Sequence, residues 1–325
     1  MKSTRKVSVI IVNYNGIDHV DACISSVSRQ TYPDFEIIFV DNDSTDGSLS
    51  YAEARFPNLI FLANKRNLAY GGGICSALAS ASGKYIAPLN IDTEVAADWL
   101  YEQVHFLDEN PAVGAVTPKL LLFDNRNRIN ALGMNIHVSG LGFCRELYRK
   151  DRSLTEAHMV CGFSGSSFLI RREILERINE VVDQWPILYD DVVLSWITQL
   201  MGYDIWCVPK AVVYHKYRLK INPNKFYLLE LERYSLLLST LKPTTFLIYF
   251  PVFAIIELLT ISFSMLKGKE YVKSKVRALA GVFRRFPDIR RKRRGYQELR
   301  KISDFRLFKN LSWNLAWTQL LSILN

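Results

Sequence analysis

The chain is poor in cysteine, and this scarcity removes several classes of protein. It has five cysteines among 325 residues, and no two of them form a Cys-x-x-Cys pair. Such pairs are typical of zinc sites and thiol redox centres. No secretory signal pattern opens the sequence either, because charged residues lead directly into an apolar run. We therefore expect a reduced, cytoplasmic protein that uses its cysteines for core packing: Cys23, Cys75, Cys144, Cys161 and Cys207.

Other absences narrow the class further. No low-complexity tract or internal repeat is visible, and 49% hydrophobic with 22% charged residues is ordinary for a globular protein. No G-x-G-x-x-G motif follows the first apolar run, which disfavours a dinucleotide-binding domain. The glycine- and lysine-rich loop that nucleotidyltransferases place after their first strand is also missing. The length suits one large domain or two modest ones.

Excess positive charge is confined to one C-terminal segment. The whole chain carries +9, whereas residues 267–301 contain 14 Lys or Arg and three acidic residues, so this segment carries +11 and the remainder −2. A basic segment can meet nucleic acid or anionic lipid. A long apolar stretch immediately before it favours an anionic membrane surface, and we expect no nucleic-acid partner.

Short apolar runs alternate with helical patterns in the N-terminal half. Residues 7–12 and 36–40 are rich in β-branched side chains, the pattern of strands buried on both faces of a parallel sheet. The predicted elements are strands at 7–12, 36–40, 59–62 and 85–90, and helices at 19–30 and near 74–81. This order predicts an α/β fold with a doubly wound, mostly parallel sheet.

Polar clusters follow three of these strands, at residues 13–16, 41–46 and 90–93. Ligands of doubly wound sheets bind at the carboxyl ends of the strands, so the three clusters are expected to share one crevice. Ordinary turns use the same residue types, but three such clusters at strand ends favour a site.

The first two clusters resemble the nucleotide-binding start of family 2 glycosyltransferases. V-S-V-I-I-V-N-Y-N-G at 7–16 is followed, after the next strand, by D-N-D-S-T-D-G at 41–47. The resemblance implies a GT-A fold, which is Rossmann-like, in which Asp41 accepts a hydrogen bond from a pyrimidine base. It also implies a nucleotide-sugar pocket, to which we assign Val12, Asn13, Tyr14, Asn15 and Asp43.

The segment N-L-A-Y-G-G-G at 67–73 is similar to the family's N-x-G-F-A-x-G-N, with Ala69 and Ile74 where glycine and asparagine are usual. Glycines there let the backbone approach the donor closely. A glycine-rich helix entry would give the same pattern, so we assign only Asn67 to the donor site.

L-N-I-D-T at 89–93 matches the family's Asp-x-Asp metal site, in the N-x-D form found among its rhamnosyl- and galactofuranosyltransferase members. The resemblance implies a Mg²⁺ or Mn²⁺ ion that neutralises the leaving nucleoside diphosphate. Asp92 is the expected ligand, with Asn90 and Ile91 lining the donor. His215 occupies the place of the family's late histidine, near the metal and diphosphate, although an isolated histidine is more often structural.

Two later segments resemble the acceptor side of the family. G-F-S-G-S-S-F-L-I-R at 162–171 precedes L-Y-D-D-V-V-L at 188–194, which resembles the family's F-x-E-D-V-D-L. An inverting single displacement needs one carboxylate to accept the proton of the acceptor hydroxyl. The resemblance assigns this role to Asp191, and Asp190, which replaces the usual Glu, stays open as an alternative base. Carboxylates at a helix start can also be capping groups.

The C-terminal third begins with a predicted helix at 225–241, which Pro243 ends. Residues 244–266 then include thirteen Leu, Ile, Val or Phe. At roughly −0.3 to −0.6 kcal/mol each, these give about −4 to −8 kcal/mol for insertion, against a penalty of about +3 kcal/mol for the central charge of Glu257. Membrane insertion is therefore energetically possible.

A single crossing is disfavoured, because nucleotide sugars and the +11 segment both belong on the cytosolic side. We predict an in-plane or re-entrant element in which Pro251 permits a bend, with residues 284–294 meeting anionic headgroups. Residues 305–324 are predicted to add one amphipathic helix, with Leu307, Leu311 and Leu315 aligned and Trp313 and Trp317 at the interface. A helical subdomain packed on the catalytic core or in a dimer is the alternative.

Together the sequence predicts a catalytic domain at 1–220 and a helical, membrane-associating region at 221–325. The resemblance implies an inverting, metal-dependent hexosyltransferase at the cytoplasmic face of the cell membrane, peripheral or monotopic. It would transfer a sugar, with rhamnose as one candidate, from a UDP- or dTDP-sugar to a polyprenyl-diphosphate-linked saccharide or growing surface glycan. A homo-oligomer is left open. The rival function is a catalytically impaired, membrane-bound scaffold that keeps the nucleotide-sugar pocket.

Overall fold

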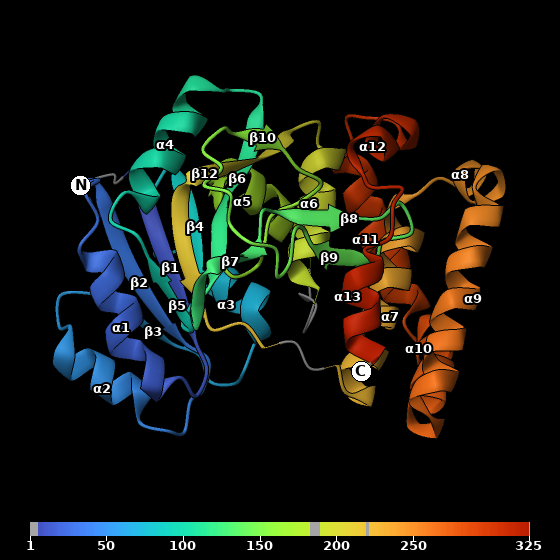
Figure 1. The fold of residues 1–325 in the computed structure, drawn as a ribbon, viewed down its shortest axis with the longest axis horizontal. Coiled ribbons are helices and arrows are strands. Elements are labelled where there is room, and N and C mark those ends of the chain that lie inside the picture. The colour runs from blue at the N-terminus through green and yellow to red at the C-terminus, as the bar shows by residue number, and fades with distance from the viewer. Residues whose placement is uncertain (1–5, 183–188, 219–220, 325) are drawn as a thin grey trace.

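The structure is a computed structural model that describes residues 6–182, 189–218 and 221–324, with side chains to residue 320. An α/β part and a helical part lie side by side (Figure 1). The strands are β1 (Val7–Asn13), β2 (Phe35–Asp41), β3 (Ile60–Ala63), β4 (Tyr85–Asn90), β5 (Thr93–Val95), β6 (Val113–Leu122), β7 (Asn125–Ala131), β8 (Met134–Ile136), β9 (Gly142–Cys144), β10 (His158–Met159), β11 (Leu169–Arg171) and β12 (Asp204–His215).

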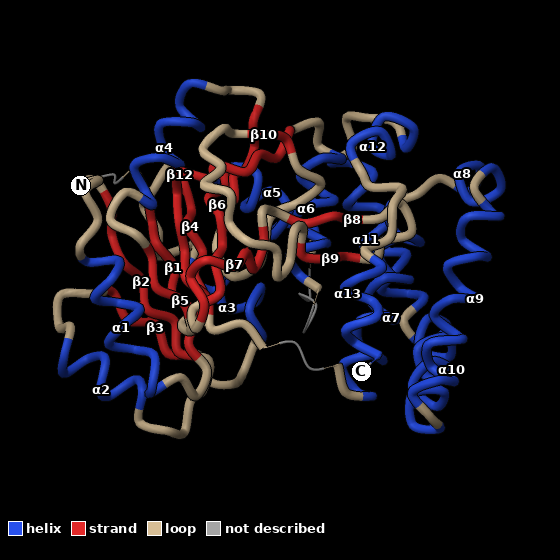
Figure 2. The backbone as a smooth tube through the Cα atoms, in the orientation of Figure 1, coloured by secondary structure: helices blue, strands red, loops and turns tan. Residues whose placement is uncertain are grey.

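The helices are α1 (Ile17–Ser28), α2 (Ser48–Arg55), α3 (Ala69–Ala77), α4 (Trp99–Glu109), α5 (Arg172–Val181), α6 (Asp190–Leu200), α7 (Pro223–Thr240), α8 (Pro243–Ile248), α9 (Phe250–Lys267), α10 (Lys269–Arg284), α11 (Phe286–Leu299), α12 (Asp304–Asn310) and α13 (Trp317–Leu324). Figure 2 shows the strands gathered in one half of the molecule and the later helices in the other.

The central sheet has the strand order β10-β12-β6-β11-β4-β1-β2-β3, with β5 and β7 joined at its sides. Strands β3, β2, β1 and β4 are mutually parallel, and β12 is parallel to β6. Strand β11 is antiparallel to both of its neighbours, β4 and β6. The predicted mixed α/β fold with a mostly parallel sheet is confirmed.

Both faces of the sheet are covered, as continuous β-branched strands require. Along β1, Val9 and Ile11 join one hydrophobic cluster, and Ile10 and Val12 join another on the opposite face. The first cluster includes residues of α1, α2 and α4, and the second includes residues of α3, α5 and α6. The sheet is therefore doubly wound, and its carboxyl-terminal edge stays open for a site.

Most predicted strands match closely, and β4 has the predicted bounds. The helix expected near residues 74–81 is placed wrongly, because α3 begins at Ala69. Ala69 has a positive φ of 61°, and its N–H donates to Oδ1 of Asn67, which starts the helix early. The glycines continue inside the helix: a Cβ at Gly73 would lie 2.8 Å from the Val12 side chain.

The cysteine prediction is confirmed in part. All five thiols are free, and Cys23 and Cys207 are buried in the core. The other three are partly buried.

The C-terminal apolar stretch forms two helices rather than one bent element. Helix α8 ends at Ile248, and Pro251 lies in the first turn of α9, where a proline is tolerated because its N–H would have no helical partner. Among the described residues, α9 is the one helix long and apolar enough to cross a membrane, and little of it is buried. It packs with α10, which in turn lies against α7.

The prediction of a single amphipathic helix at residues 305–324 is wrong. Helices α12 and α13 are separate, and Ser312 between them bonds to the end of β8. The Ser312 N–H donates to the Ile136 carbonyl at 2.7 Å, and the Val138 N–H donates to the Ser312 carbonyl at 3.0 Å. These backbone bonds interrupt the helix, and Leu307 and Leu311 pack into the main core instead of facing a membrane.

The helical part and the α/β part share one hydrophobic cluster. Tyr296 of α11 and Phe308 of α12 belong to the same cluster as Ile10 of β1. The proposed boundary between residues 220 and 221 falls between β12 and α7, and it remains a prediction about the organisation of the chain.

Candidate functional site

The carboxyl ends of β1 and β2 meet through their side chains. Nδ2 of Asn13 donates to Oδ1 of Asp41 at 2.8 Å and to Oγ of Ser48 at 2.7 Å. The Ser44 N–H donates to the other Asp41 oxygen at 2.9 Å. Asp41 is only 3% exposed. The predicted base-binding carboxylate is therefore held by its own turn and by β1 before any ligand arrives.

The next predicted residues lie just after the ends of β1, β2 and β4. Tyr14 is 52% exposed, and Asn15, with φ of 51°, accepts the Thr45 N–H on Oδ1 at 2.8 Å. Asp43 lies in the same turn region with φ of 67°. Ile91 packs against Gly16, where a Cβ would lie 2.9 Å from Ile91 and 2.5 Å from Oδ1 of Asn13.

Asp46, in the turn between β2 and α2, was not assigned to the site from the sequence. Its carboxylate accepts the Ile17 N–H at 2.9 Å and the Ser48 hydroxyl. Partial burial raises the pKa of Asp46, but the hydrogen bonds lower it by a larger amount, so the net pKa lies below its ordinary value. Asp46 thus links the start of α1 to the start of α2 and orders the turn after β2.

Asp92 and His215 come together because β5 pairs with the end of β12. Nε2 of His215 lies 3.5 Å from Oδ1 of Asp92, and Nδ1 of His215 lies 2.8 Å from Oδ1 of Asn130. His215 is 7% exposed. Burial raises the pKa of Asp92, but the hydrogen bond and charge of His215 and the charge of His19 outweigh it, so the net pKa is lowered.

This pair fits a divalent cation. When Asn130 accepts the proton on Nδ1 of a neutral His215, Nε2 presents a lone pair toward the buried Oδ1 of Asp92, 3.5 Å away. Two facing electron-pair donors suit a metal ion whose other ligands are phosphate and water oxygens. Within the described residues no group of three His, Cys, Asp or Glu side chains gathers, so the protein contribution here is a pair.

Asp190 and Asp191 begin α6, directly after Tyr189, which has φ of 83°. Oδ2 of Asp190 accepts the Gly71 N–H at 2.8 Å, which ties α6 to α3. Asp191 accepts the Val192 N–H at 2.8 Å and the Gly165 N–H at 3.3 Å. Leu188, the first residue of the predicted motif, lies outside the described residues.

Both carboxyl groups have raised pKa values. Burial and the neighbouring Asp191 raise the pKa of Asp190 to about 7. Burial also raises the pKa of Asp191, although backbone N–H donors and the charge of Lys225 oppose the shift. A carboxylate with a raised pKa is a better proton acceptor near neutral pH.

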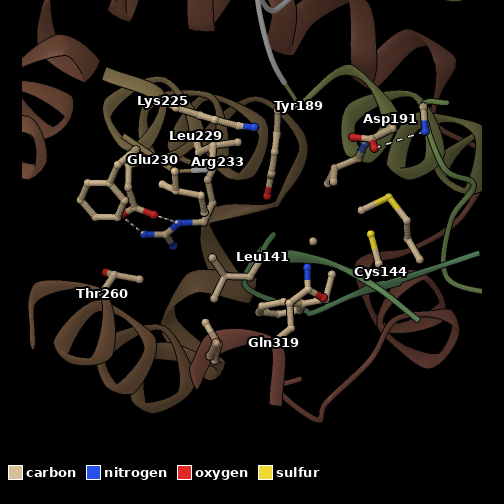
Figure 3. A pocket seen from close by; sticks show the side chains of 18 of the residues that line it. Leu141, Cys144, Tyr189, Asp191, Lys225, Leu229, Glu230, Arg233, Thr260 and Gln319 are labelled. Carbon is tan, nitrogen blue, oxygen red and sulfur yellow. Dashed lines mark hydrogen bonds and ion pairs between the residues drawn. The ribbon is translucent and has the colours of Figure 1, made fainter. Parts of the chain in front are cut away.

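A cavity of about 590 Å³ lies beside the two aspartates, and Asp191 is on its wall (Figure 3). Its walls include Asn90, Ser166, Asp190 and Asp191. Oγ of Ser166 lies 3.3 Å from Nδ1 of His215, so the Asp92–His215 pair lies just behind this wall. The remaining predicted donor residues lie outside the cavity walls: Val12, Asn13, Tyr14, Asn15, Asp41, Asp43, Asn67 and Ile91.

Two residues of the segment at 67–73 are placed differently from what the sequence suggested: Asn67, which we assigned to the donor site, and Tyr70, which we did not. Asn67 is exposed, and its side chain holds only the N–H of Ala69. Tyr70 lines the cavity, and its buried hydroxyl has no hydrogen-bond partner in the part of the chain that the structure describes. Burial and the charge of Asp190 raise its pKa well above the ordinary value. The aromatic position inside the segment at 67–73 was the available signal, but nothing in the sequence showed where the ring would point.

Comparison with known proteins adds a family and a fold. Residues 8–178 match the model of the family described as Glycosyl transferase family 2. The UDP-Glc:alpha-D-GlcNAc-diphosphoundecaprenol beta-1,3-glucosyltransferase WfgD of Escherichia coli is 26% identical over 227 residues, which are 68% of this chain and 81% of that protein. The chain spans a quarter to about half the length of the first curated relatives that it matches.

Two solved structures have the same fold. S. aureus TarS 1-349 in complex with UDP-GlcNAc has a TM-score of 0.58 and 17% identity, over 94% of this chain and 90% of that one. Mannosyltransferase PcManGT from Pyrobaculum calidifontis, in complex with GDP-Man and Mn²⁺, has a TM-score of 0.55 and 18% identity, over 95% and 86%. These similarities confirm the predicted GT-A fold.

Proposed function

Because the chain belongs to glycosyl transferase family 2, we propose that it transfers a sugar from a nucleotide sugar to a saccharide acceptor with inversion at the anomeric carbon. The observation that carries the proposal is that one cavity is lined by Asp190 and Asp191 and also by Asn90 and Ser166, and that Ser166 contacts His215 of the Asp92–His215 pair. The donor would be a UDP- or dTDP-sugar, with Asp41 accepting a hydrogen bond from the base. Rhamnose is one candidate sugar, supported by the N-I-D sequence at 90–92.

Asp191 is proposed as the base. It accepts the proton of the acceptor hydroxyl while that oxygen bonds to the anomeric carbon and the bond to the nucleoside diphosphate breaks. Asp191 is partly exposed in the cavity, whereas Asp190 is 8% exposed and holds the Gly71 N–H. Asp190 thus suits a positioning role, and it remains the alternative base.

Asp92 and His215 are proposed to hold Mg²⁺ or Mn²⁺ together with the donor diphosphate. The bound cation supplies positive charge that stabilises the leaving group. Mn²⁺ is present in the PcManGT complex, which has the same fold. Asn130 orients the His215 ring through Nδ1, so that Nε2 faces Asp92.

We also propose that residues 221–325 attach the enzyme to the cytoplasmic face of a membrane. Helix α9 exposes Ile255, Leu258, Met265 and Leu266 along one side, at exposures of 57–75%. Glu257 does not oppose membrane contact as the sequence suggested, because it pairs with Arg233 and Lys275 at 3.0 and 2.8 Å.

The basic segment has a divided role in this proposal. Arg285 pairs with Glu232 at 2.7 Å, and Arg293 donates to the carbonyls of Leu238 and Leu241 at the end of α7. These two arginines stabilise the helical part by bonding to residues of α7 and of its C-terminal end. The exposed Arg284, Arg290 and Arg294 are the ones we expect to contact anionic headgroups.

Thermal-shift measurements on the full chain test the donor site. One UDP- or dTDP-sugar is expected to raise Tm with Mn²⁺ and much less without it, because a ligand of the folded state raises stability. The Asp92→Asn variant should lose the Mn²⁺-dependent part of this rise in Tm. The Asp18→Asn variant, an exposed change on α1, should keep it. An unchanged response in Asp92→Asn, or no response to any nucleotide sugar, would contradict the proposal.

A further inference from the structure

We propose that the end of the cavity remote from Asp191 binds the apolar chain of a lipid-linked acceptor, with Lys225 contacting the phosphate that joins chain to saccharide. This inference rests on the proposed function and adds a binding site to it. The cavity is larger than the catalytic groups require, because it continues beyond them along α7 to α9 and α13. The walls of that remote end are mostly apolar: Leu259, Phe263, Leu266, Leu315, Trp317 and Leu320.

The order of groups along the cavity matches an amphiphilic ligand. In Figure 3, Tyr189 and Lys225 lie between Asp191 and the Glu230–Arg233 pair, and Thr260 of α9 lies beyond that pair. A saccharide hydroxyl at Asp191 would therefore place a connecting phosphate near Lys225 and an apolar chain against α9 and α13.

Lys225 is a cation available to a phosphate. Among the described residues, no carboxylate forms an ion pair with its ammonium group. Arg233, the other cation of the walls, is bound by both Glu230 and Glu257. Lys225 and Asp191 line the same cavity, and the charge of Lys225 opposes the rise in the pKa of Asp191.

The apolar end opens at the molecular surface. Leu266 and Trp317 both line the cavity, yet they are 75% and 56% exposed. Leu266 also belongs to the exposed side of α9 with Leu258. A lipid chain at this surface would enter the cavity without exposing its length to water. A soluble saccharide would gain nothing from such a wall, which favours a lipid over other acceptors.

Binding of radiolabelled farnesyl diphosphate to the full chain tests the site, with saturating UDP and Mn²⁺ present to occupy the donor diphosphate site. Leu266→Glu is expected to weaken binding at least tenfold. Met265→Glu is the matched control, because Met265 is 66% exposed on the same helix but does not line the cavity. It should change affinity less than twofold. Lys225→Met should weaken farnesyl diphosphate binding and leave farnesol binding unchanged.

If Leu266→Glu and Met265→Glu lost the same affinity for farnesyl diphosphate, the lipid would be adhering to the surface in general, and the proposal would be overturned. Failure of the parent to bind farnesyl diphosphate while its nucleotide-sugar thermal shift is intact would also overturn it, and would leave the proposed function standing. A change from dimer to monomer in Leu266→Glu, measured by sedimentation, would assign the apolar end to a second copy instead.

A separate observation concerns Tyr70. We infer that its hydroxyl bonds to the sugar of the donor and helps to select it. The hydroxyl is buried and has no hydrogen-bond partner among the described residues, and Tyr70 lines the cavity together with Asn90 and Asp190. The ring is held in place by its neighbours, because Gly71 N–H donates to Asp190 and the Ala69 carbonyl accepts Nδ2 of Asn42 at 2.9 Å. An unpaired buried hydroxyl is costly, and a sugar hydroxyl would satisfy it.

Tyr70→Phe removes only this oxygen. The variant is expected to keep or raise Tm in the absence of ligand and to bind the nucleotide sugar about tenfold more weakly, while affinity for bare UDP changes less than twofold. Tyr51→Phe, an exposed change on α2, is the control. Parent-like affinity for the nucleotide sugar, or an equal loss for UDP, would overturn the role of Tyr70. If the parent bound neither ligand, the proposed function itself would fail.

Discussion

Two groups of charged side chains have members on the walls of the same cavity, and they differ in charge balance. At one end Glu230 and Glu257 meet Arg233 and Lys275, with two charges of each sign. At the other end Asp190 and Asp191 are adjacent, and no described cation forms an ion pair with either. Both groups are largely buried, so burial alone does not separate them.

The pKa values show the consequence of that difference. Burial raises the pKa of Glu230, but Arg233 and Lys275 lower it more strongly, to about 2. Burial and a like charge raise the pKa of Asp190 to about 7. Balanced buried charges stay ionised and hold α7, α9 and α10 together, whereas the unbalanced pair is ready to accept a proton.

The largest effect is expected at the unbalanced end. Asp191→Asn should lower turnover by roughly 10² to 10⁴, because the amide cannot accept the acceptor proton while its oxygen can still accept the Gly165 and Val192 N–H groups. Initial rates of UDP or dTDP release, with Tm as the folding control, measure this. If Asp190→Asn lowered turnover more than Asp191→Asn, Asp190 would be the base and Asp191 the positioning residue.

The balanced end should affect stability instead. Arg233→Met leaves Glu230 buried with one cation fewer and should lower the free energy of unfolding by about 3–5 kcal/mol. Urea unfolding followed by circular dichroism measures the change. The double variant Glu230→Gln/Arg233→Met should regain part of the loss. A loss below about 1 kcal/mol in Arg233→Met would mean that the ion pairs are replaceable by water.

The smallest effect is a pH dependence that distinguishes the two ends. Asp190 binds its proton more tightly in the folded state than in the unfolded state, so the protein should lose stability as pH rises from about 4 to 7. Relative to Asp190→Asn, the parent should lose up to about 1.4 kcal/mol per pH unit in this window. Unfolding free energies at pH 5, 6 and 7 provide the slope.

Glu230→Gln sharpens that measurement. The folded-state pKa of Glu230 is lowered to about 2, so the stability it contributes is complete above the ordinary pKa and is lost only in stronger acid. Its slope between pH 5 and 7 should equal that of the parent. An equal slope in Asp190→Asn and the parent would show that Asp190 is ionised throughout.

The sequence predicted β1 to β4, because strands buried on both faces have continuous apolar runs, but it did not predict β6, β11 and β12, which continue the sheet. Apolar runs predicted β4 with its observed bounds and β1 to within one residue, although Ile86 is the one β-branched residue of β4. It also predicted that the polar ends of these strands converge, since that follows from a parallel sheet. Asp92 and His215, 123 positions apart, are adjacent because β5 and β12 pair, a contact that only the family resemblance anticipated.

The C-terminal third could not be predicted as far. From the sequence, Glu257 was counted as a charge that opposes membrane insertion, because its ion-pair partners lie on other helices. Arg233 lies 24 positions earlier in the chain and Lys275 lies 18 positions later. Periodicity likewise could not reveal that Ser312 bonds to β8 and divides the last helix. Both outcomes depend on tertiary contacts between distant segments, which local patterns do not contain. Tyr70 was missed for the same reason.

The bonds of Ser312 have a further consequence for truncated forms of the chain. By pairing with Ile136 and Val138, Ser312 covers an edge of the small β8–β9 sheet. A chain ending before residue 312 would leave that edge with unpaired N–H and carbonyl groups. Uncovered sheet edges recruit strands from other molecules, so the cost of such a truncation would be self-association and poor solubility as well as lost helices.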